Sequence, residues 1–146
     1  MSDTFAISFS GKKLPALVAG IDFAKMKRGV LGVKYELSLS FVSDTQMHVI
    51  NKTYRHKDAT TDVLSFELEK DLPAAHGRAA QAGAGEMFIS IKEATRRAPT
   101  FGMSAHVYIA YLYIHGLVHL RGHDHGSTMD RLEKKYCKQF DIKMPS

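Results

Sequence analysis

The chain has 146 residues, of which 45% are hydrophobic and 24% charged, and its formal net charge is +5 at pH 7. These values are typical of an ordinary soluble protein with one domain and a substantial core. We expect neither a signal peptide nor a membrane span, because no apolar stretch has the required length or flanking charges. The single cysteine, Cys137, excludes an internal disulfide, so a cytoplasmic protein is expected.

The first part of the chain is expected to form a strand, a helix and a second strand. Apolar residues alternate with smaller or polar ones over Thr4–Phe9 and Tyr35–Phe41, as in strands with one buried face. A helix is predicted from Pro15 to about Arg28, because proline suits the first helical turn. Gly29 and Gly32 are expected to close this helix.

A capped helix and a third strand come next. Ser43 and Gln46 have the spacing of a capping box, which predicts a helix from Ser43 to near Arg55. Asp58 to Thr61 are expected to form a turn, and Val63–Leu68 has the composition of the third strand.

The second half begins with a long connection, Lys70–Ala84, which is rich in Ala, Gly and Asp. A fourth strand is predicted at Glu86–Ile91 and a short helix at Glu93–Ala98. Ser104–Leu120 carries no formal charge and is apolar nearly all round, so this helix belongs inside the domain. Ser127 is expected to cap a final helix, whose inward residues are Leu132, Tyr136 and Phe140.

This order predicts an α+β fold with α/β-like connections, in one metal-binding domain over residues 1–146. About five helices should pack on a small mixed four-stranded sheet. The helices between the first three strands should make those strands parallel, with right-handed crossovers. The third and fourth strands are joined without a helix, so we expect that pair to be antiparallel.

Four histidines lie within eleven residues, from His115 to His125. His115 and His119 are four residues apart, so on a helix both rings project from one face. Gly122 can adopt a positive φ, end the helix and let the chain return His125 toward the other two. Three neutral imidazoles with a fourth position open can hold a catalytic zinc ion. We therefore predict one Zn²⁺ per chain, with His115, His119 and His125 as ligands; the alternative is a set of core histidines bonded to backbone carbonyls.

The spacing His-x-x-x-His-x-x-Gly-x-x-His also matches the metzincin proteases, which carry Glu directly after the first histidine. In this chain that position is Gly116, which argues against ordinary peptide hydrolysis. Asp124 is the nearest carboxylate that could act as proton acceptor instead. A role for Asp124 in orienting a ligand or capping a helix is equally consistent with its position.

The densest basic stretch runs from Lys52 to Lys57. It fits either a solvated helix end, where cations complement the helix dipole, or a patch that contacts phosphates. Arg55 is suited to grip two phosphate oxygens at once. The moderate basic excess is compatible with an RNA partner, although many basic proteins bind none.

The histidine motif from His115 to His125 resembles the signature of the bacterial YbeY family of rRNA maturation factors. The resemblance covers most of the chain from Tyr35 to about Asp130, and its further motifs are Asn51 to Asp58, Thr61 to Phe66 and Gly85 to Ser90. Two positions depart modestly: His123 stands where an aromatic residue is common, and Glu86 where the strand often carries Asp.

This resemblance implies a zinc-dependent, single-strand-specific endoribonuclease in 16S rRNA 3′-end maturation and ribosome quality control. Small-subunit rRNA, the ribosome, ribosomal proteins and assembly factors are the implied partners. The resemblance maps the metal ligands onto His115, His119 and His125, and a functionally important arginine onto Arg55. Asp124 is kept as a second candidate catalytic residue. The candidate RNA-binding residues are Lys52, Arg55, His56, Lys57 and Arg121.

Two other functions remain open at this point. One is a metallopeptidase, suggested by the metzincin spacing. The other is a ribosome assembly factor whose metal is structural and whose role is binding.

Overall fold

The computed structural model describes residues 5–9, 14–68, 83–122 and 126–145. One sheet has the strand order β1-β2-β4-β3. Its strands are β1 (Phe5–Phe9), β2 (Glu36–Val42), β3 (Val63–Glu67) and β4 (Ala84–Ser90). β1 pairs with β2, and β2 with β4, in parallel, whereas β3 pairs with β4 in antiparallel fashion. The predicted α+β fold with a small mixed sheet is confirmed.

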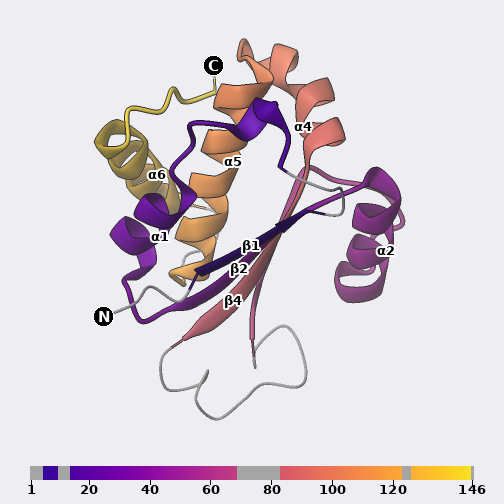
Figure 1. The fold of residues 1–146 in the computed structure, drawn as a ribbon, viewed down its shortest axis with the longest axis horizontal. Helices are drawn as coiled ribbons and strands as arrows, with labels where there is room; N and C mark the ends of the chain where they lie inside the picture. Colours follow the sequence, from indigo (N-terminus) through magenta and orange to yellow (C-terminus); the bar gives the residue numbers. More distant parts are fainter. Residues whose placement is uncertain (1–4, 10–13, 69–82, 123–125, 146) are drawn as a thin grey trace.

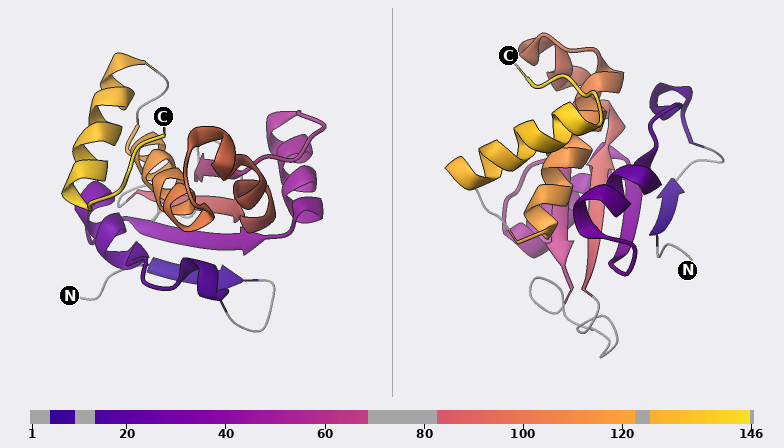
Figure 2. Two further views of the ribbon diagram at one scale, coloured as in Figure 1. Left: turned by 90° about the horizontal axis from the view of Figure 1, so that it is seen from above. Right: turned by 90° about the vertical axis from the view of Figure 1, so that its left-hand side faces the viewer.

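The described residues contain five α-helices and two short 3₁₀ helices. The α-helices are α1 (Phe23–Leu31), α2 (Asp44–Arg55), α4 (Ile91–Arg97), α5 (Ala105–Leu120) and α6 (Ser127–Gln139). Figures 1 and 2 show α5, with α1 and α6 beside it, on one side of the sheet and α2 on the other side, near β3. Within the described part of the chain, no helix has the length and apolar character needed to span a bilayer.

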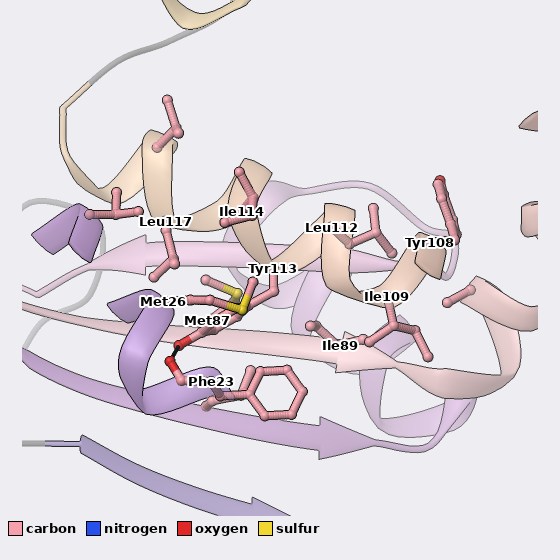
Figure 3. Packing of buried hydrophobic residues seen from close by; sticks show 14 of the residues in the cluster. Phe23, Met26, Met87, Ile89, Tyr108, Ile109, Leu112, Tyr113, Ile114 and Leu117 are labelled. Carbon is pink, nitrogen blue, oxygen red and sulfur yellow. Dashed lines mark hydrogen bonds between the residues drawn. The ribbon is translucent and has the colours of Figure 1, made fainter. Parts of the chain in front are cut away.

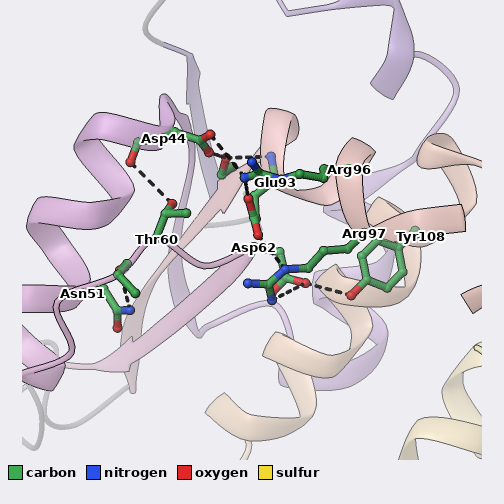
Figure 4. A network of polar contacts seen from close by, with 10 residues as sticks. Asp44, Asn51, Thr60, Asp62, Glu93, Arg96, Arg97 and Tyr108 are labelled. Carbon is green, nitrogen blue, oxygen red and sulfur yellow. Dashed lines mark hydrogen bonds and ion pairs between the residues drawn. The ribbon is translucent and has the colours of Figure 1, made fainter. Parts of the chain in front are cut away.

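The direction of β3 differs from the prediction that the first three strands are parallel. The chain bends at Asp58 and Ala59, within the predicted turn, and the residues that follow α2 run back beside the helix. Asn51 Nδ2 donates to the Ala59 carbonyl at 2.9 Å, and Thr60 Oγ1 donates to the Asp44 carbonyl at 3.4 Å (Figure 4). β3 therefore starts at the end of the sheet where β2 stopped, and it runs antiparallel to its neighbour β4.

Two predicted helices begin at different residues in the structure. The helix expected from Pro15 to Arg28 is divided into a 3₁₀ helix at Ala16–Val18 and α1. The break comes from Gly20, whose φ is +86°, and from Asp22, whose side chain accepts a hydrogen bond from the Lys25 amide and starts a new helix. At α6 the N-cap is Gly126, so Ser127 is the first helical residue and not the cap.

Smaller differences affect other predicted boundaries. Gly29 lies inside α1, and only Gly32 is at its C-terminal end. The strand expected at Glu86–Ile91 is Ala84–Ser90 in the structure. It ends at Ser90 because the Ser90 side chain accepts a hydrogen bond from the Glu93 amide and caps α4, which begins at Ile91. Most of the predicted connection Lys70–Ala84 lies outside the described residues, and Ala84 itself begins β4.

Helix α5 is the central element of the core, as its uncharged sequence predicts. Tyr113, Ile114 and Leu117 on this helix have no exposed surface, and neither has Met87 on β4 (Figure 3). The Tyr113 hydroxyl donates to the Phe23 carbonyl at 2.8 Å, which satisfies the polar atom of a buried ring and joins α5 to α1. The position of α5 against the sheet is thereby fixed by packing over most of its length.

A buried polar network fixes the start of β3. Asp62, which is 7% exposed, accepts a 2.7 Å hydrogen bond from the Tyr108 hydroxyl and forms a 3.4 Å ion pair with Arg97 (Figure 4). Arg97 also donates to Glu93 at 2.6 Å. Burial, and then the Asp62 carboxylate, raises the pKa of Tyr108, so its hydroxyl remains a donor. The network joins the beginning of β3 to α4 and α5, three residues before Ser65.

We predict that Cys137 is chemically inert in the folded protein. Its side chain is 1% exposed on α6, and burial, aided by the Glu133 carboxylate, raises the pKa of the thiol to about 12. At mildly alkaline pH a disulfide reagent such as DTNB should react with it only as fast as the protein unfolds. The same protein in denaturant, where the thiol is labelled at once, is the control; prompt labelling of the folded protein would contradict this prediction.

Candidate active site

His115 and His119 occupy the last two turns of α5, on the same face of the helix. The helix ends at Leu120, and Gly122 follows with a φ of +107°, as the sequence predicts. The Gly122 amide donates to the His119 carbonyl at 3.0 Å, which completes the end of the helix. Asp124 and His125, the predicted proton acceptor and third ligand, lie outside the described residues.

Glu133 fixes the ring of His115. The Nδ1 atom of His115 lies 2.6 Å from Glu133 Oε2, and the Tyr111 hydroxyl donates to Glu133 Oε1 at 2.7 Å. Because an ionised carboxylate only accepts hydrogen bonds, Nδ1 carries the proton, and Nε2 is the nitrogen through which a neutral His115 would bind a metal. Burial raises the pKa of Tyr111, and its bond to Glu133 raises it further, so the phenol stays a donor.

Glu133 has no part in the site predicted from the sequence. It lies on α6, is 4% exposed and shares its inward face with Met129, Tyr136 and Cys137. A carboxylate placed among apolar residues at helical spacing was the available signal, because a buried charge requires a partner. α6 has many charged residues, so Glu133 is easily taken for one of its solvated side chains.

Ser65 on β3 holds the second histidine. Its hydroxyl lies 2.9 Å from His119 Nδ1, so both histidines have a partner at the same ring nitrogen. The two partners come from different elements, β3 and α6, which pack against α5. A hydrogen bond at Nδ1 that orients the ring toward a metal at Nε2 is the arrangement found around most histidine ligands. The donors present therefore suit a divalent metal, although the described residues alone contain no group of three such donors.

The same Ser65 also holds Arg55. Arg55 Nη2 donates to the Ser65 carbonyl at 2.8 Å, and the guanidinium carbon lies 4.6 Å from the centroid of the Phe66 ring. β3 is an edge strand, and Ser65 and Phe66 point to opposite faces of the sheet. Arg55 thus reaches the edge from the α2 side, whereas His119 approaches from the α5 side. The structure brings these two predicted site residues together around one serine.

The other predicted RNA-binding residues fall in two places. Lys52, His56 and Lys57 are exposed at the C-terminal end of α2, next to Arg55. Arg121 also has exposed surface, but its guanidinium donates to the Tyr136 hydroxyl and packs over the Tyr136 ring on α6.

Gly116 is buried against β4. A Cβ atom at this position would lie 2.6 Å from Met87 Cε and 2.8 Å from Met87 Sδ. A glutamate here would place its side chain in the core between α5 and the sheet. Glycine at this position lets α5 pack closely on Met87 of β4.

The family model described as Endoribonuclease YbeY matches residues 10–141 of this chain. The chain belongs to the YbeY family. The matched range contains Arg55, Ser65, His115, His119 and Glu133. The resemblance seen in the histidine motif is confirmed.

The relatives within the YbeY family are similar over most of their length. Endoribonuclease YbeY of Halalkalibacterium halodurans is 39% identical over 112 residues, which are 74% of this chain and 70% of that protein. Endoribonuclease YbeY of Macrococcus caseolyticus is 35% identical over 131 residues, or 90% and 84% of the two chains. A protein of Thermotoga maritima solved in solution has the same fold, with a TM-score of 0.59, 21% identity and coverage of 94% of this chain and 91% of that one.

Proposed function

We propose that this protein is a zinc-dependent endoribonuclease that cleaves single-stranded RNA. The observation that supports this most directly is the pair of contacts made by Ser65, with the ring of His119 and the guanidinium of Arg55. One group is a typical metal ligand and the other a typical phosphate ligand. A metal-dependent cleavage of a phosphodiester can use both kinds of group at one place, since negative charge grows on the phosphoryl oxygens.

In this proposal the zinc ion would be held by His115, His119 and His125. When bound, it would supply Lewis-acid activation of water and of the phosphoryl oxygen. Glu133 and Ser65 hold the rings of His115 and His119 at Nδ1, which is the contact that orients a histidine ligand. Asp124, adjacent to His125 in the sequence, is the proposed proton acceptor.

Arg55 would hold the scissile phosphate. Its guanidinium uses Nη2 on the Ser65 carbonyl, and its other N–H donors can bind phosphate oxygens. Lys52, His56 and Lys57 add sequence-independent affinity for the RNA backbone, which weakens as salt increases. Arg121 would contribute from the side of α6. A single strand suits this site because its backbone can bend into it.

We further propose a cytoplasmic role in 16S rRNA 3′-end maturation and ribosome quality control, with the ribosome and its assembly factors as partners. Membership in the YbeY family and the net charge of +5 support an RNA substrate. The metallopeptidase alternative is opposed by the packing of Gly116. A purely structural metal in an assembly factor gives no reason for Arg55 and His119 to bond the same serine.

We predict that Glu133→Gln weakens zinc binding about 10- to 100-fold, because the His115 ring loses its charged partner. Zinc affinity is measured by competition with a chromophoric chelator, without RNA. Asp130→Asn removes one negative charge from an exposed position on the same helix. It is the matched control and should leave the zinc affinity unchanged. Equal affinities for wild type and Glu133→Gln would rule out the orienting role of this carboxylate.

We predict that His119→Ala lowers cleavage of a 3′-extended small-subunit rRNA fragment about 100-fold or more, and that Arg55→Lys lowers it about 10-fold or more. Arg131→Lys, at an exposed position on α6, should cleave like wild type. Cleavage is followed by gel electrophoresis, on single-stranded and on duplex RNA.

Three results would count against the proposal. Equal cleavage by His119→Ala and wild type would remove the metal site from the reaction. Chelator-sensitive cleavage of an unstructured protein substrate would favour the metallopeptidase. A protein that binds zinc and small-subunit rRNA but leaves the RNA intact would favour the assembly factor.

A further inference from the structure

Helix α2 exposes an aromatic ring beside its basic end. The Tyr54 side chain is 45% exposed, and it is the one aromatic among the large hydrophobic side chains exposed in the described residues, the others being Leu14 and Val49. A single exposed hydrophobic residue is common in proteins and needs no explanation. The surroundings of Tyr54 set it apart from Leu14 and Val49.

A shared neighbour fixes Tyr54 and Arg55 in position. The Tyr54 ring meets the buried ring of Phe66 edge to face, with 5.6 Å between centroids and 62° between planes. The guanidinium of Arg55 lies 4.6 Å from the centroid of the same Phe66 ring. An aromatic ring that is packed on one side and exposed on the other can stack on a ligand at little cost in conformational entropy.

Tyr54 is also connected to the proposed active site. Arg55, its neighbour in the chain, donates to the Ser65 carbonyl, and the Ser65 hydroxyl contacts His119. A ligand on the Tyr54 ring would therefore lie next to whatever group Arg55 binds.

The charges around Tyr54 favour an anionic ligand. Lys52, His56 and Lys57 are exposed on this end of α2. The nearby carboxylate of Asp58 is engaged by His48 at 2.6 Å and by Lys52 at 4.0 Å, and the His48 hydrogen bond, with Lys52, lowers its pKa. Asp58 is the carboxylate nearest to Tyr54 in the sequence, and its negative charge is thus offset by its contacts with His48 and Lys52.

We propose that the ring of Tyr54 stacks on a nucleobase of the RNA, next to the nucleotide whose phosphate Arg55 holds. This inference rests on the proposed function and names the group that favours a single strand. A base inside a duplex has both faces covered by its neighbours, whereas an unpaired base offers a face to an aromatic ring. Stacking is tolerant of base identity, so little sequence preference is expected at this position.

The test measures binding without cleavage. A fluorescein-labelled single-stranded oligoribonucleotide is titrated with protein in the presence of a chelator, and its anisotropy is recorded. Tyr54→Phe, which keeps the ring, should bind within about twofold of wild type. Tyr54→Leu, which still covers Phe66 but has no aromatic face, should bind about 5- to 10-fold more weakly. Val49→Ala, at an exposed position on the same helix, is the matched control and should bind like wild type.

Two further measurements separate stacking from charge. The dependence of affinity on salt should be the same for Tyr54→Leu and wild type, because no phosphate contact is removed. An oligonucleotide of the same length in which every position is abasic keeps the phosphates in whatever register the strand binds. Wild type should bind this strand about 5- to 10-fold more weakly than the ordinary strand, and Tyr54→Leu should show a smaller difference between the two. The comparison of the two strands on wild type is informative even if the leucine variant folds poorly.

The outcomes distinguish this inference from the function on which it rests. If wild type neither binds nor cleaves single-stranded RNA, the proposed function fails and the inference fails with it. If wild type and Tyr54→Leu bind and cleave RNA equally, the nuclease stands and the stacking role is overturned. Equal binding of the fully abasic and the ordinary strand by wild type would likewise overturn it.

Discussion

The geometry of the candidate site depends on the hydrogen bonds of one serine. Ser65 bonds Arg55 through its carbonyl and His119 through its hydroxyl, so two residues 64 positions apart in the sequence meet at one edge of the sheet. Neither α2 nor α5 alone could bring these groups together, because they cover opposite sides of the sheet. β3 makes the connection, and the buried network of Asp62, Tyr108 and Arg97 fixes where β3 begins.

Local patterns predicted most of the fold. The alternation in β2, the capping box of Ser43 and Gln46, and the uncharged run of α5 each lie within one element, and the structure confirms each of them. The direction of β3 was not predictable in this way. It depends on hydrogen bonds between α2 and the residues that follow it, and such bonds leave no periodic signal in the sequence. The break at Gly20 was missed because a proline and apolar residues suit a continuous helix as well as a divided one.

The site was predictable to the extent that its residues form a motif. The spacing of His115 and His119 and the basic stretch around Arg55 are visible in the sequence, and the structure brings His119 and Arg55 to one serine. Glu133 and Ser65 are isolated residues on other elements, and their roles follow only from three-dimensional contacts. These two residues show how the fold supports the motif: each histidine ring is oriented by a different part of the chain that packs on α5.

The contact of Arg55 with Ser65 has a consequence for how the molecule behaves in a crowded solution. Main-chain groups of an antiparallel strand alternate between facing the partner and facing outward, and the Leu68 amide faces β4, where it donates to the Ala84 carbonyl. Ser65 lies three residues before Leu68, so its carbonyl faces the other way, away from β4. Unpaired groups on such an edge invite strands of other molecules to join the sheet. By bonding this carbonyl, the arginine proposed to hold RNA also occupies one of the groups through which another strand could join this edge of the sheet.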